Sequence, residues 1–579
     1  MPEGHRAPAV FVLIACALVA LFLAQSFLAS RVKSPTFDEA THIAAGLSYV
    51  RTGEVRANPQ HPPLLKTIAG LSLLLAGMRL PDIPETRRML GGAGGENAVG
   101  RAVISRNGPD RVMFWARLPF PLLAAMLGLL IYFWVRKLAG DVAALAALFL
   151  YALDPTILAH SYLVTMDVGL ALFAVLFLFA LWEYLQFPSS RRLLFCGLAM
   201  GALLAAKFSA VFLLPVAAAL LLAAVRWPPQ PVPDDRSQLL CPYSRSSADA
   251  SAVRGYAAAA CAFLAICLMA TLVIQALYFS PGGLFLYSTG IQRVNVDHAP
   301  DYPVFLAGRL QHNFTGYFAA AYLLKEPVAS LLLVAIGLVA LARSKTISVL
   351  AKLFLLLPPA VLFAAHTIWA DNMGIRYMIP ELPFACCLGG MGAAWLIQSR
   401  SRWTRLLAVV LAVWIVVAAI GIYPDHLSYF NEAACLPGHL NRIGIDGGAR
   451  CGPLWLDDSN VDWGQGLKQL KGWLDRHARG RAIRLAYFGT FLPEAYGVAC
   501  ERIGPEELME DPQPGLYAVS AHFVARVPAL GARLKPGAGE WLRRTPPVAI
   551  VGHAFYVYEI GVKTTARRMG RRMASRLTF

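Results

Sequence analysis

The sequence contains few charged residues. Of its 579 residues, 15% are charged and 57% are hydrophobic, and the mean hydropathy is +0.53. Soluble domains average about 25% charged residues. The shortage therefore excludes a soluble enzyme and predicts a mainly α-helical protein that crosses a membrane several times. The net charge of +17 does not indicate nucleic acid as a partner, because the basic residues lie mainly between apolar segments.

The cysteines lack the spacing of a metal site. The chain has ten, with no CxxC pair, so the sequence offers no zinc or iron–sulfur framework. Most lie in apolar segments, where cysteine behaves as a small hydrophobic residue. A disulfide between Cys435 and Cys451 is open to this chain if its C-terminal part faces an oxidising compartment, and the sequence alone does not decide the pairing.

Two further absences concern the membrane topology. The first apolar segment, about Ala7 to Ala29, is not followed by a convincing small-residue cleavage site, so we expect a retained helix and no removed signal peptide. No internal repeat is visible, which disfavours the paired halves typical of transporters.

About eleven apolar segments have the composition of membrane helices. A shorter stretch, Leu64 to Met78, is interpreted as a juxtamembrane or re-entrant helix. After the first segment, the predicted spans are approximately 112–135, 141–160, 167–187, 192–207, 208–226, 256–279, 326–342, 347–368, 376–397 and 404–422.

The short connections between these segments are basic at alternate crossings, which places the N-terminus and those connections in the cytoplasm. Arg31 and Lys33 are local exceptions on the outer side. The segments predicted to face outward are 30–110, 280–325, 369–375 and everything after about residue 423.

The chain divides by composition into two parts. Residues 1–422 form the membrane region, with 30–110 as its first outer loop, and residues 423–579 have the character of a small extracytoplasmic α+β domain. Within the second part, we expect strands near 483–488 and 548–558 and a helix near 466–477. A basic tail containing Arg567 to Arg576 ends the chain, and we interpret it as a disordered or lipid-contacting end.

Three carboxylates on the outer side are the candidate catalytic residues. Asp38 and Glu39 follow the first span, and Asp167 opens the span 167–187 at its outer end. An acidic pair beside a membrane helix needs water, a cation or a chemical role. A carboxylate there can act as a general base toward an incoming hydroxyl or amine. The alternatives are helix capping for Asp38 and Glu39 and a favourable helix-dipole position for Asp167.

Four residues on the same side are candidate phosphate ligands. Arg376 can form paired hydrogen bonds with a phosphate, and Tyr377 follows it. Lys207 lies between two apolar segments, where extension to the membrane surface is its alternative role. His61, in the Pro-rich stretch 58–66, binds an anion or only shapes the turn.

A second acidic cluster lies in the C-terminal part. Two interpretations are open for it: a cation or acceptor site, or a polar turn before the helix near Gly466. Its members are Asp457, Asp458, Asn460 and Asp462.

Several of these stretches together resemble the bacterial family 39 glycosyltransferases, members of the C-type membrane superfamily related to protein mannosyltransferases and to the lipid A aminoarabinose transferase. The similarity extends from about residue 7 to 500. It rests on FDEATHIAAGLSYVRTGEVRANPQHPPLLK, LVTMDVGLALF and GIRYMIP, with YPDHLSYFNEAACLPG and DDSNVDWGQGLKQLKGWL resembling the C-terminal part of one bacterial subgroup.

The resemblance implies the C-type fold and an inverting transfer of a sugar from a polyprenyl-phosphate donor to a protein or an envelope glycan or lipid. It implies Asp38 as the base, with Glu39 beside it, Asp167 at the acceptor and Arg376 on the donor phosphate. No metal ligand is assigned, and a divalent cation is the one cofactor left open, because some superfamily members depend on one. The implied location is a bacterial inner membrane. A transporter or flippase of lipid-linked sugars is the alternative function.

Overall fold

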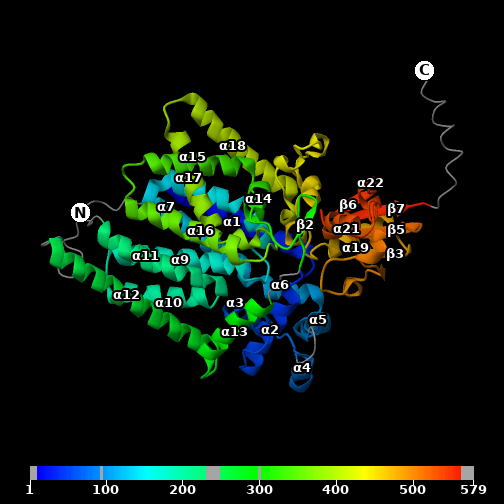
Figure 1. Ribbon diagram of the computed structural model, residues 1–579, viewed down its shortest axis with the longest axis horizontal. Helices are drawn as coiled ribbons and strands as arrows, with labels where there is room; N and C mark the ends of the chain where they lie inside the picture. Colours follow the sequence, from blue (N-terminus) through cyan, green and yellow to red (C-terminus); the bar gives the residue numbers. More distant parts are fainter. Residues whose placement is uncertain (1–8, 91–94, 230–247, 298–301, 562–579) are drawn as a thin grey trace.

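The computed structural model describes residues 9–90, 95–229, 248–297 and 302–561. Long helices lie side by side in one half of the molecule, and a small sheet with its helices lies at the opposite end (Figure 1). The predicted basic tail around Arg567 lies outside the described residues.

The membrane half is built almost entirely from helices. They are α1 (Ala9–Val32), α2 (Glu39–Thr52), α3 (Leu64–Leu75), α4 (Ile83–Leu90), α5 (Gly95–Asn107), α6 (Pro109–Arg117), α7 (Pro119–Ala152), α8 (Pro155–His160), α9 (Asp167–Gln186), α10 (Ser190–Leu204), α11 (Leu213–Arg226), α12 (Ala248–Leu277), α13 (Gly283–Asp297), α14 (Tyr317–Lys325), α15 (Val328–Arg343), α16 (Val349–Trp369), α17 (Leu382–Gln398) and α18 (Arg402–Ile422). Between them lie the hairpin β1 (Val304–Leu306) and β2 (Arg309–Gln311) and the short 3₁₀ helices η1 (Phe208–Phe212) and η2 (Ile375–Met378).

The C-terminal part mixes short helices with strands. Its 3₁₀ helices are η3 (His426–Ser428), η4 (Glu432–Cys435), η5 (Leu440–Arg442), η6 (Ala449–Leu454), η7 (Asp458–Asn460) and η8 (Pro493–Tyr496). Its α-helices are α19 (Leu467–His477), α20 (Pro505–Met509), α21 (Ala521–Leu534) and α22 (Trp541–Arg544), and its strands are β3 (Ile483–Ala486), β4 (Glu501–Arg502), β5 (Gly515–Ser520), β6 (Ala549–Val551) and β7 (Phe555–Ile560).

The number of membrane spans differs from the predicted eleven. Among the described residues, seven helices are long and apolar enough to cross a membrane, or eight if the bent pair α14–α15 counts as one span. The predicted span 112–135 and most of 141–160 fall in one helical stretch, 109–152, which counts as a single candidate span although it is broken at Gly140, where φ is 84°. The end of the second predicted span lies in α8. The predicted spans 192–207 and 376–397 contain α10 and α17, which have only 15 and 17 residues. The multi-span helical fold is confirmed, and the count of eleven is not.

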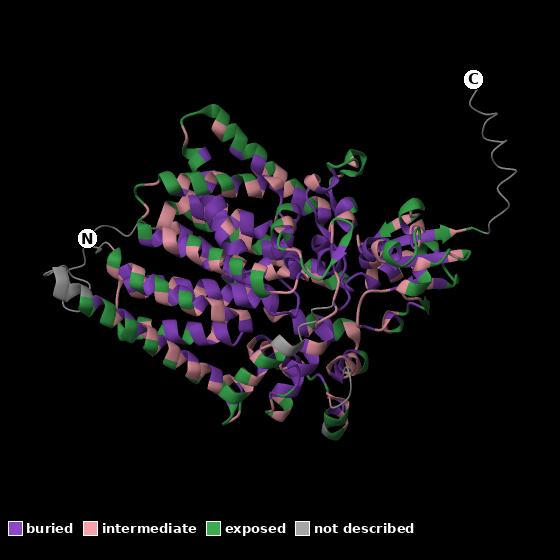
Figure 2. Cartoon of the chain, in the orientation of Figure 1, coloured by how far each residue is buried: buried purple, intermediate pink, exposed green. Residues whose placement is uncertain are grey.

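Burial separates the central helices from the peripheral ones. Most of α9 is buried, and the buried residues of α7 and α17 belong to the same apolar core. The outer helices α12 and α18 keep large apolar side chains exposed, for example Leu264 and Val409 (Figure 2). An apolar surface of this kind suits contact with lipid.

The first outer loop folds into five short helices, α2 to α6. α2 and α3 touch backbone to backbone, because a Cβ atom at Gly46 or at Gly70 would collide with a carbonyl of the facing helix. This close crossing fixes the direction of α2, and Asp38 is the N-cap residue of α2.

The C-terminal part contains the predicted strands and helix. Its five-stranded sheet has the order β4-β3-β5-β7-β6, with β3 parallel to β4 and β5, and β7 antiparallel to β5 and β6. α19 occupies most of the predicted helix 466–477. The strand-like runs 483–488 and 548–558 predicted β3, β6 and β7, and most residues of β3 and β7 are buried.

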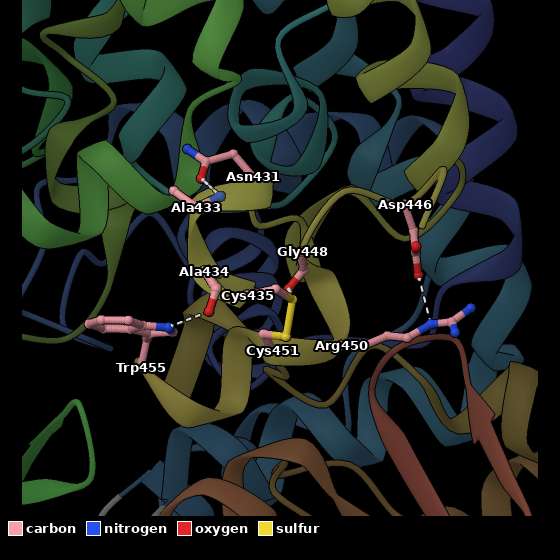
Figure 3. Close-up of a disulfide and its surroundings, with 9 residues drawn as sticks. All are labelled: Asn431, Ala433, Ala434, Cys435, Asp446, Gly448, Arg450, Cys451 and Trp455. Carbon is pink, nitrogen blue, oxygen red and sulfur yellow. Dashed lines mark hydrogen bonds and ion pairs between the residues drawn. A yellow bond between two sulfur atoms is a disulfide. The ribbon is translucent and has the colours of Figure 1, made fainter. Parts of the chain in front are cut away.

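A disulfide joins Cys435 and Cys451 in the stretch between the last membrane helix and α19 (Figure 3). Both cysteines are fully buried, and their Cα atoms are 5.5 Å apart. The indole of Trp455 donates a hydrogen bond of 2.7 Å to the carbonyl of Ala434 next to the bridge. The disulfide left open by the sequence is therefore present.

Candidate active site

The side chain of Glu39 is completely buried and accepts five hydrogen bonds. Arg117 makes two of them, from Nε at 2.8 Å and Nη2 at 2.6 Å. Thr36 donates from its backbone N–H and its hydroxyl, and Val164 donates from its backbone N–H at 3.1 Å. Although burial raises the pKa of Glu39, Arg117 and the other donors lower it below the usual value, so this carboxylate is ionised.

The contacts of α2 with Val164 bring two predicted site residues into one region. Glu39 binds the N–H of Val164, and the Nδ1 atom of His42 lies 2.6 Å from its carbonyl oxygen. Val164 stands three residues before Asp167, the first residue of α9. These two contacts attach the loop before Asp167 to α2, the helix that follows Asp38.

Asp38 differs from its neighbour because its side chain is 27% exposed. Its Oδ2 accepts a hydrogen bond of 2.8 Å from Nη1 of Arg376 in η2. The Arg376 guanidinium also lies 4.5 Å from the ring centre of Trp463, a cation–π contact. Burial lowers the pKa of Arg376, but the charge of Asp38 more than offsets this and raises it above the ordinary value.

Asp167 forms a second ion pair close to the first. The Nζ atom of Lys207 donates to its Oδ1 at 2.7 Å, and the same Nζ lies 4.7 Å from the ring centre of Tyr377. The Arg376 guanidinium lies 5.5 Å from the same ring. Tyr377 therefore stands between the two cations, and four sequence-predicted residues join it in one cluster: Asp38, Asp167, Lys207 and Arg376.

A cavity of about 320 Å³ opens beside Lys207 and Tyr377. We call it the Lys207 cavity. His61 lines its polar end, and apolar side chains of η1, α13 and α16 form the rest of its wall. Phe212 and Trp369 stack in that wall with ring centres 5.3 Å apart. The cavity thus has one cation, Lys207, in a lining that also contains Asp371, and much of its wall is apolar.

His61 lies in a turn that is held by a buried lysine. Nζ of Lys66 donates to the carbonyls of Asn58 and His61 at 2.6 and 2.7 Å and to the Asn58 side chain at 3.2 Å. The ring centres of His61 and His42 are 5.6 Å apart. Burial, His42 and Lys66 lower the pKa of His61 well below the usual value, so the imidazole is neutral at pH 7.

The segment 457–460 of the C-terminal part clamps the turn that carries Arg376. The side chain of Asn460 accepts a hydrogen bond of 2.9 Å from the N–H of Ile375, and Ser459 donates one of 2.9 Å to the carbonyl of Met373. Asn460 also donates to the hydroxyl of Tyr317 at 3.0 Å. Its backbone carbonyl accepts a bond from Lys325, so its position is fixed by both ends of α14 and by η2.

The next residues of the same segment hold the loop before Asp38. Phe37 donates its N–H to the carbonyl of Trp463 at 2.8 Å. The hydroxyl of Ser34 donates to the carbonyl of Gly464 at 2.9 Å and accepts from the N–H of Leu467 at 3.0 Å. One C-terminal segment therefore contacts both halves of the Asp38–Arg376 pair.

The acidic residues 457–462 are used within the protein. Asp457 pairs with Nε of Arg526 at 2.7 Å, and Asp462 accepts hydrogen bonds from Ser520 and from the N–H of Gly464. Burial raises the pKa of both carboxyls to about 7. For Asp457 and Asp462, this geometry fits a buried structural turn better than a cation or acceptor site.

No group of three His, Cys, Asp or Glu side chains within the described ranges is arranged to hold a metal ion. Asp38 and Asp167 each face a cation of the protein, Arg376 and Lys207. This donor set does not fit a divalent cation.

Sequence reasoning missed Arg117 and the role of Lys66, and it considered Asn460 only as a member of the acidic cluster, not as the partner of the turn that carries Arg376. Arg117 was assigned to a membrane span, 112–135, but it ends the juxtamembrane helix α6, and Pro119 begins α7. That proline was a usable signal, because proline favours the first turn of a helix. Nothing in the sequence marked the partners of Asn460, which are distant along the chain.

Residues 110–233 match the family model for dolichyl-phosphate-mannose-protein mannosyltransferases. The matched segment contains Arg117, Asp167 and Lys207, and it confirms the resemblance inferred from the sequence. A search of curated proteins finds no match.

Solved membrane glycosyltransferases are similar to the chain at low sequence identity. ArnT from Cupriavidus metallidurans, bound to undecaprenyl phosphate, is 13% identical with a TM-score of 0.45, covering 95% of this chain and 98% of that one. The apo oligosaccharyltransferase of Archaeoglobus fulgidus is 11% identical with a TM-score of 0.47, covering 94% and 73%. The Pmt1–Pmt2 complex of S. cerevisiae, bound to its sugar donor, is 18% identical with a TM-score of 0.33, covering 50% and 35%. Similarities of this size do not bear on the roles of the site residues.

Proposed function

We propose that the chain is an inverting glycosyltransferase that uses a polyprenyl-phosphate sugar as its donor. The observation that carries this proposal is the cluster of two ion pairs, Asp38–Arg376 and Asp167–Lys207, around Tyr377, of which Lys207 and Tyr377 line the Lys207 cavity. An apolar wall suits a polyprenyl chain, and Lys207 in the lining, with Arg376 on the same tyrosine ring, suits the phosphate. The match of residues 110–233 to a mannosyltransferase family supports the same chemistry.

In this mechanism, the donor phosphate takes Arg376 and Lys207 as its partners. Nε of Arg376 is buried without a hydrogen-bond partner among the described residues, so it has donor capacity to spare. Binding of the phosphate draws the guanidinium away from Asp38, and the freed carboxylate accepts the proton of the acceptor. The acceptor oxygen or nitrogen attacks the anomeric carbon, the bond from that carbon to the phosphate oxygen breaks, and the two cations stabilise the leaving phosphate. Tyr377 and His61 complete the phosphate end.

Glu39 has a positioning role in this scheme. All five of its hydrogen bonds go to the protein frame, so it orients the start of α2 and leaves the proton transfer to Asp38. Asp167 holds Lys207 in place until the donor arrives and orients the acceptor afterwards.

We further propose that the site faces the periplasm of a bacterial inner membrane, with the N-terminus in the cytoplasm. The Cys435–Cys451 disulfide supports an oxidising compartment for the C-terminal part. The acceptor is a protein or an envelope glycan or lipid. Reporter fusions after Ile422 test this orientation, and a cytoplasmic signal would contradict it.

The test of function is complementation of a strain that lacks the chain. Mass spectrometry of its envelope glycans and glycoproteins identifies the missing sugar. We expect wild type to restore the sugar and Asp38→Asn to reduce transfer about 10²- to 10⁴-fold, the usual contribution of a general base. Asp82→Asn, an exposed acid of the same loop, is the matched control and should restore transfer. Full restoration by Asp38→Asn would sink the mechanism, and it would leave the transporter alternative in its place.

A further inference from the structure

A second cavity, of about 910 Å³, lies where α1, α6 and α19 meet. We call it the basic cavity. Its lining includes five cationic residues and only one acidic residue. They are Arg31, Lys33, Arg111, Arg117, Lys468 and Asp110.

Three of the five cations are neutralised by carboxylates of the protein. Lys33 pairs with Asp425 at 2.5 Å, and Lys468 pairs with Asp110 at 2.7 Å. Arg117 is the buried partner of Glu39. Lys33 and Arg117 therefore belong to buried pairs, whereas Lys468 belongs to a pair at the surface, in which Asp110 is 70% exposed.

Arg31 and Arg111 remain as the exposed cations of the basic cavity. Neither lies within ion-pair distance of a carboxylate in the part of the chain that the structure describes. The one side-chain bond of Arg111 among those residues, 3.0 Å to the carbonyl of Ala76, leaves its charge without a counter-ion. Arg31 is also one of the two residues that break the charge rule for the outer side, and this cavity offers a reason for its presence.

Exposed apolar side chains continue from the basic cavity along two membrane helices. At the cavity itself, Leu28 is 52% and Phe114 is 46% exposed. Leu21 lies on the same face of α1 as Leu28, two turns further along the helix, and it is also exposed. On α7, Leu122 and Met126 are exposed one turn apart. α1 and α7 pack against each other, so these exposed apolar side chains lie on two neighbouring helices.

We propose that the basic cavity binds the headgroup of an anionic phospholipid. The guanidinium groups of Arg31 and Arg111 bind the phosphate, and the acyl chains lie along Leu28, Phe114 and Leu122. A free phosphate would satisfy the cations but would leave the apolar strip uncovered, so the arrangement commits to a lipid. The Lys207 cavity has a different set of lining residues, and the proposal does not depend on the proposed transfer reaction.

The test is lipid retention by the full-length protein, measured by native mass spectrometry after reconstitution in phosphatidylglycerol or phosphatidylcholine. We expect wild type to retain phosphatidylglycerol preferentially. Arg31→Gln and Arg111→Gln should each lower this preference about fivefold, the effect of one cation near an anionic surface, and the double variant should abolish it. Arg79→Gln, an exposed arginine of the same outer loop that does not line the cavity, is the control and should bind as wild type does.

Three outcomes would overturn the proposal. They are equal retention of the two lipids by wild type, an unchanged preference in the double variant, and displacement of the lipid by millimolar glycerol phosphate, which would assign the site to a free anion. A polyprenyl phosphate added as competitor should leave the phosphatidylglycerol bound. Loss of transfer in Asp38→Asn with retention unchanged would separate this site from the proposed function.

Discussion

Two adjacent carboxylates, Asp38 and Glu39, have opposite surroundings. Glu39 faces Arg117 with neither side chain more than 2% exposed, and every donor around it belongs to the frame. Asp38 faces Arg376 with side chains 27% and 16% exposed, beside a cavity. One peptide bond therefore separates a sealed ion pair from an open one.

The difference matters because the two kinds of pair respond differently to the loss of a partner. Removing one member of a sealed pair leaves an uncompensated charge away from water. Removing one member of an open pair leaves a group that water or a ligand can reach. Sealed pairs thus maintain the position of the site, and open pairs are available for exchange with a substrate.

The largest effect on stability is expected when the sealed pair, Glu39–Arg117, loses one member. Arg117→Met leaves the Glu39 carboxylate buried without its cation, and we expect a loss of about 3–5 kcal/mol in the free energy of unfolding. Thermal unfolding of the detergent-solubilised protein, followed by tryptophan fluorescence, measures it. The double variant Glu39→Gln/Arg117→Met should recover part of the loss, and a normal melting curve for Arg117→Met would show that the pair is not sealed.

The stability contributed by an ion pair of intermediate exposure should depend on pH. His553 lies 2.8 Å from Asp425 and 3.1 Å from Asp446; although burial lowers its pKa, the bonds to these carboxylates raise it to about 9. Because the folded pKa exceeds the usual value of about 6.5, the stabilisation is complete below pH 6.5 and disappears as the pH rises through 9. We expect up to about 3 kcal/mol from this group.

Unfolding curves between pH 6 and 9.5 test the effect of His553. His553→Asn should flatten the pH dependence over this range. Wild-type stability that rises from pH 6.5 to 9 would contradict the assignment.

A smaller effect is expected where the C-terminal segment holds the open pair. Asn460→Ala removes the side-chain partner of the Ile375 N–H and of the Tyr317 hydroxyl. We expect the free energy of unfolding to fall by about 1–3 kcal/mol. The substitution also releases the turn that carries Arg376. The transfer rate should fall more than donor binding does, whereas a purely structural role would lower the amount of folded protein and leave the rate per folded molecule unchanged.

The smallest effect on stability is expected for a substitution in the open pair, Asp38–Arg376. Asp38→Asn keeps the shape of the side chain, and water reaches both members of the pair, so we expect a change within about 1 kcal/mol. The same unfolding assay checks it. A loss as large as that of Arg117→Met would erase the distinction between the two carboxylates.

Patterns within short stretches predicted much of this molecule. Apolar runs located the membrane helices, and short strand-like runs located β3, β6 and β7 in the C-terminal sheet. The predicted site residues Asp38, Asp167, Lys207, Arg376 and Tyr377 form one cluster because each lies at the end of an apolar run or in the turn beside it, and such ends meet at a membrane surface.

The features that escaped prediction depend on contacts between distant residues. Arg117 and Glu39 are 78 positions apart, and no local pattern links them. Asn460 reaches Ile375 across 85 positions. The count of eleven spans is not confirmed for a different reason: α10 and α17 have only 15 and 17 residues, and the helical stretch 109–152, broken at Gly140 between two predicted spans, counts as one candidate span.

The bonds between Ser34 and residues 464–467 connect positions more than 400 apart in the sequence. Every candidate membrane helix among the described residues precedes Trp463, the residue on which Arg376 rests, so a ribosome makes these helices first. The loop before Asp38 gains its C-terminal partners only after about four-fifths of the chain has been synthesised.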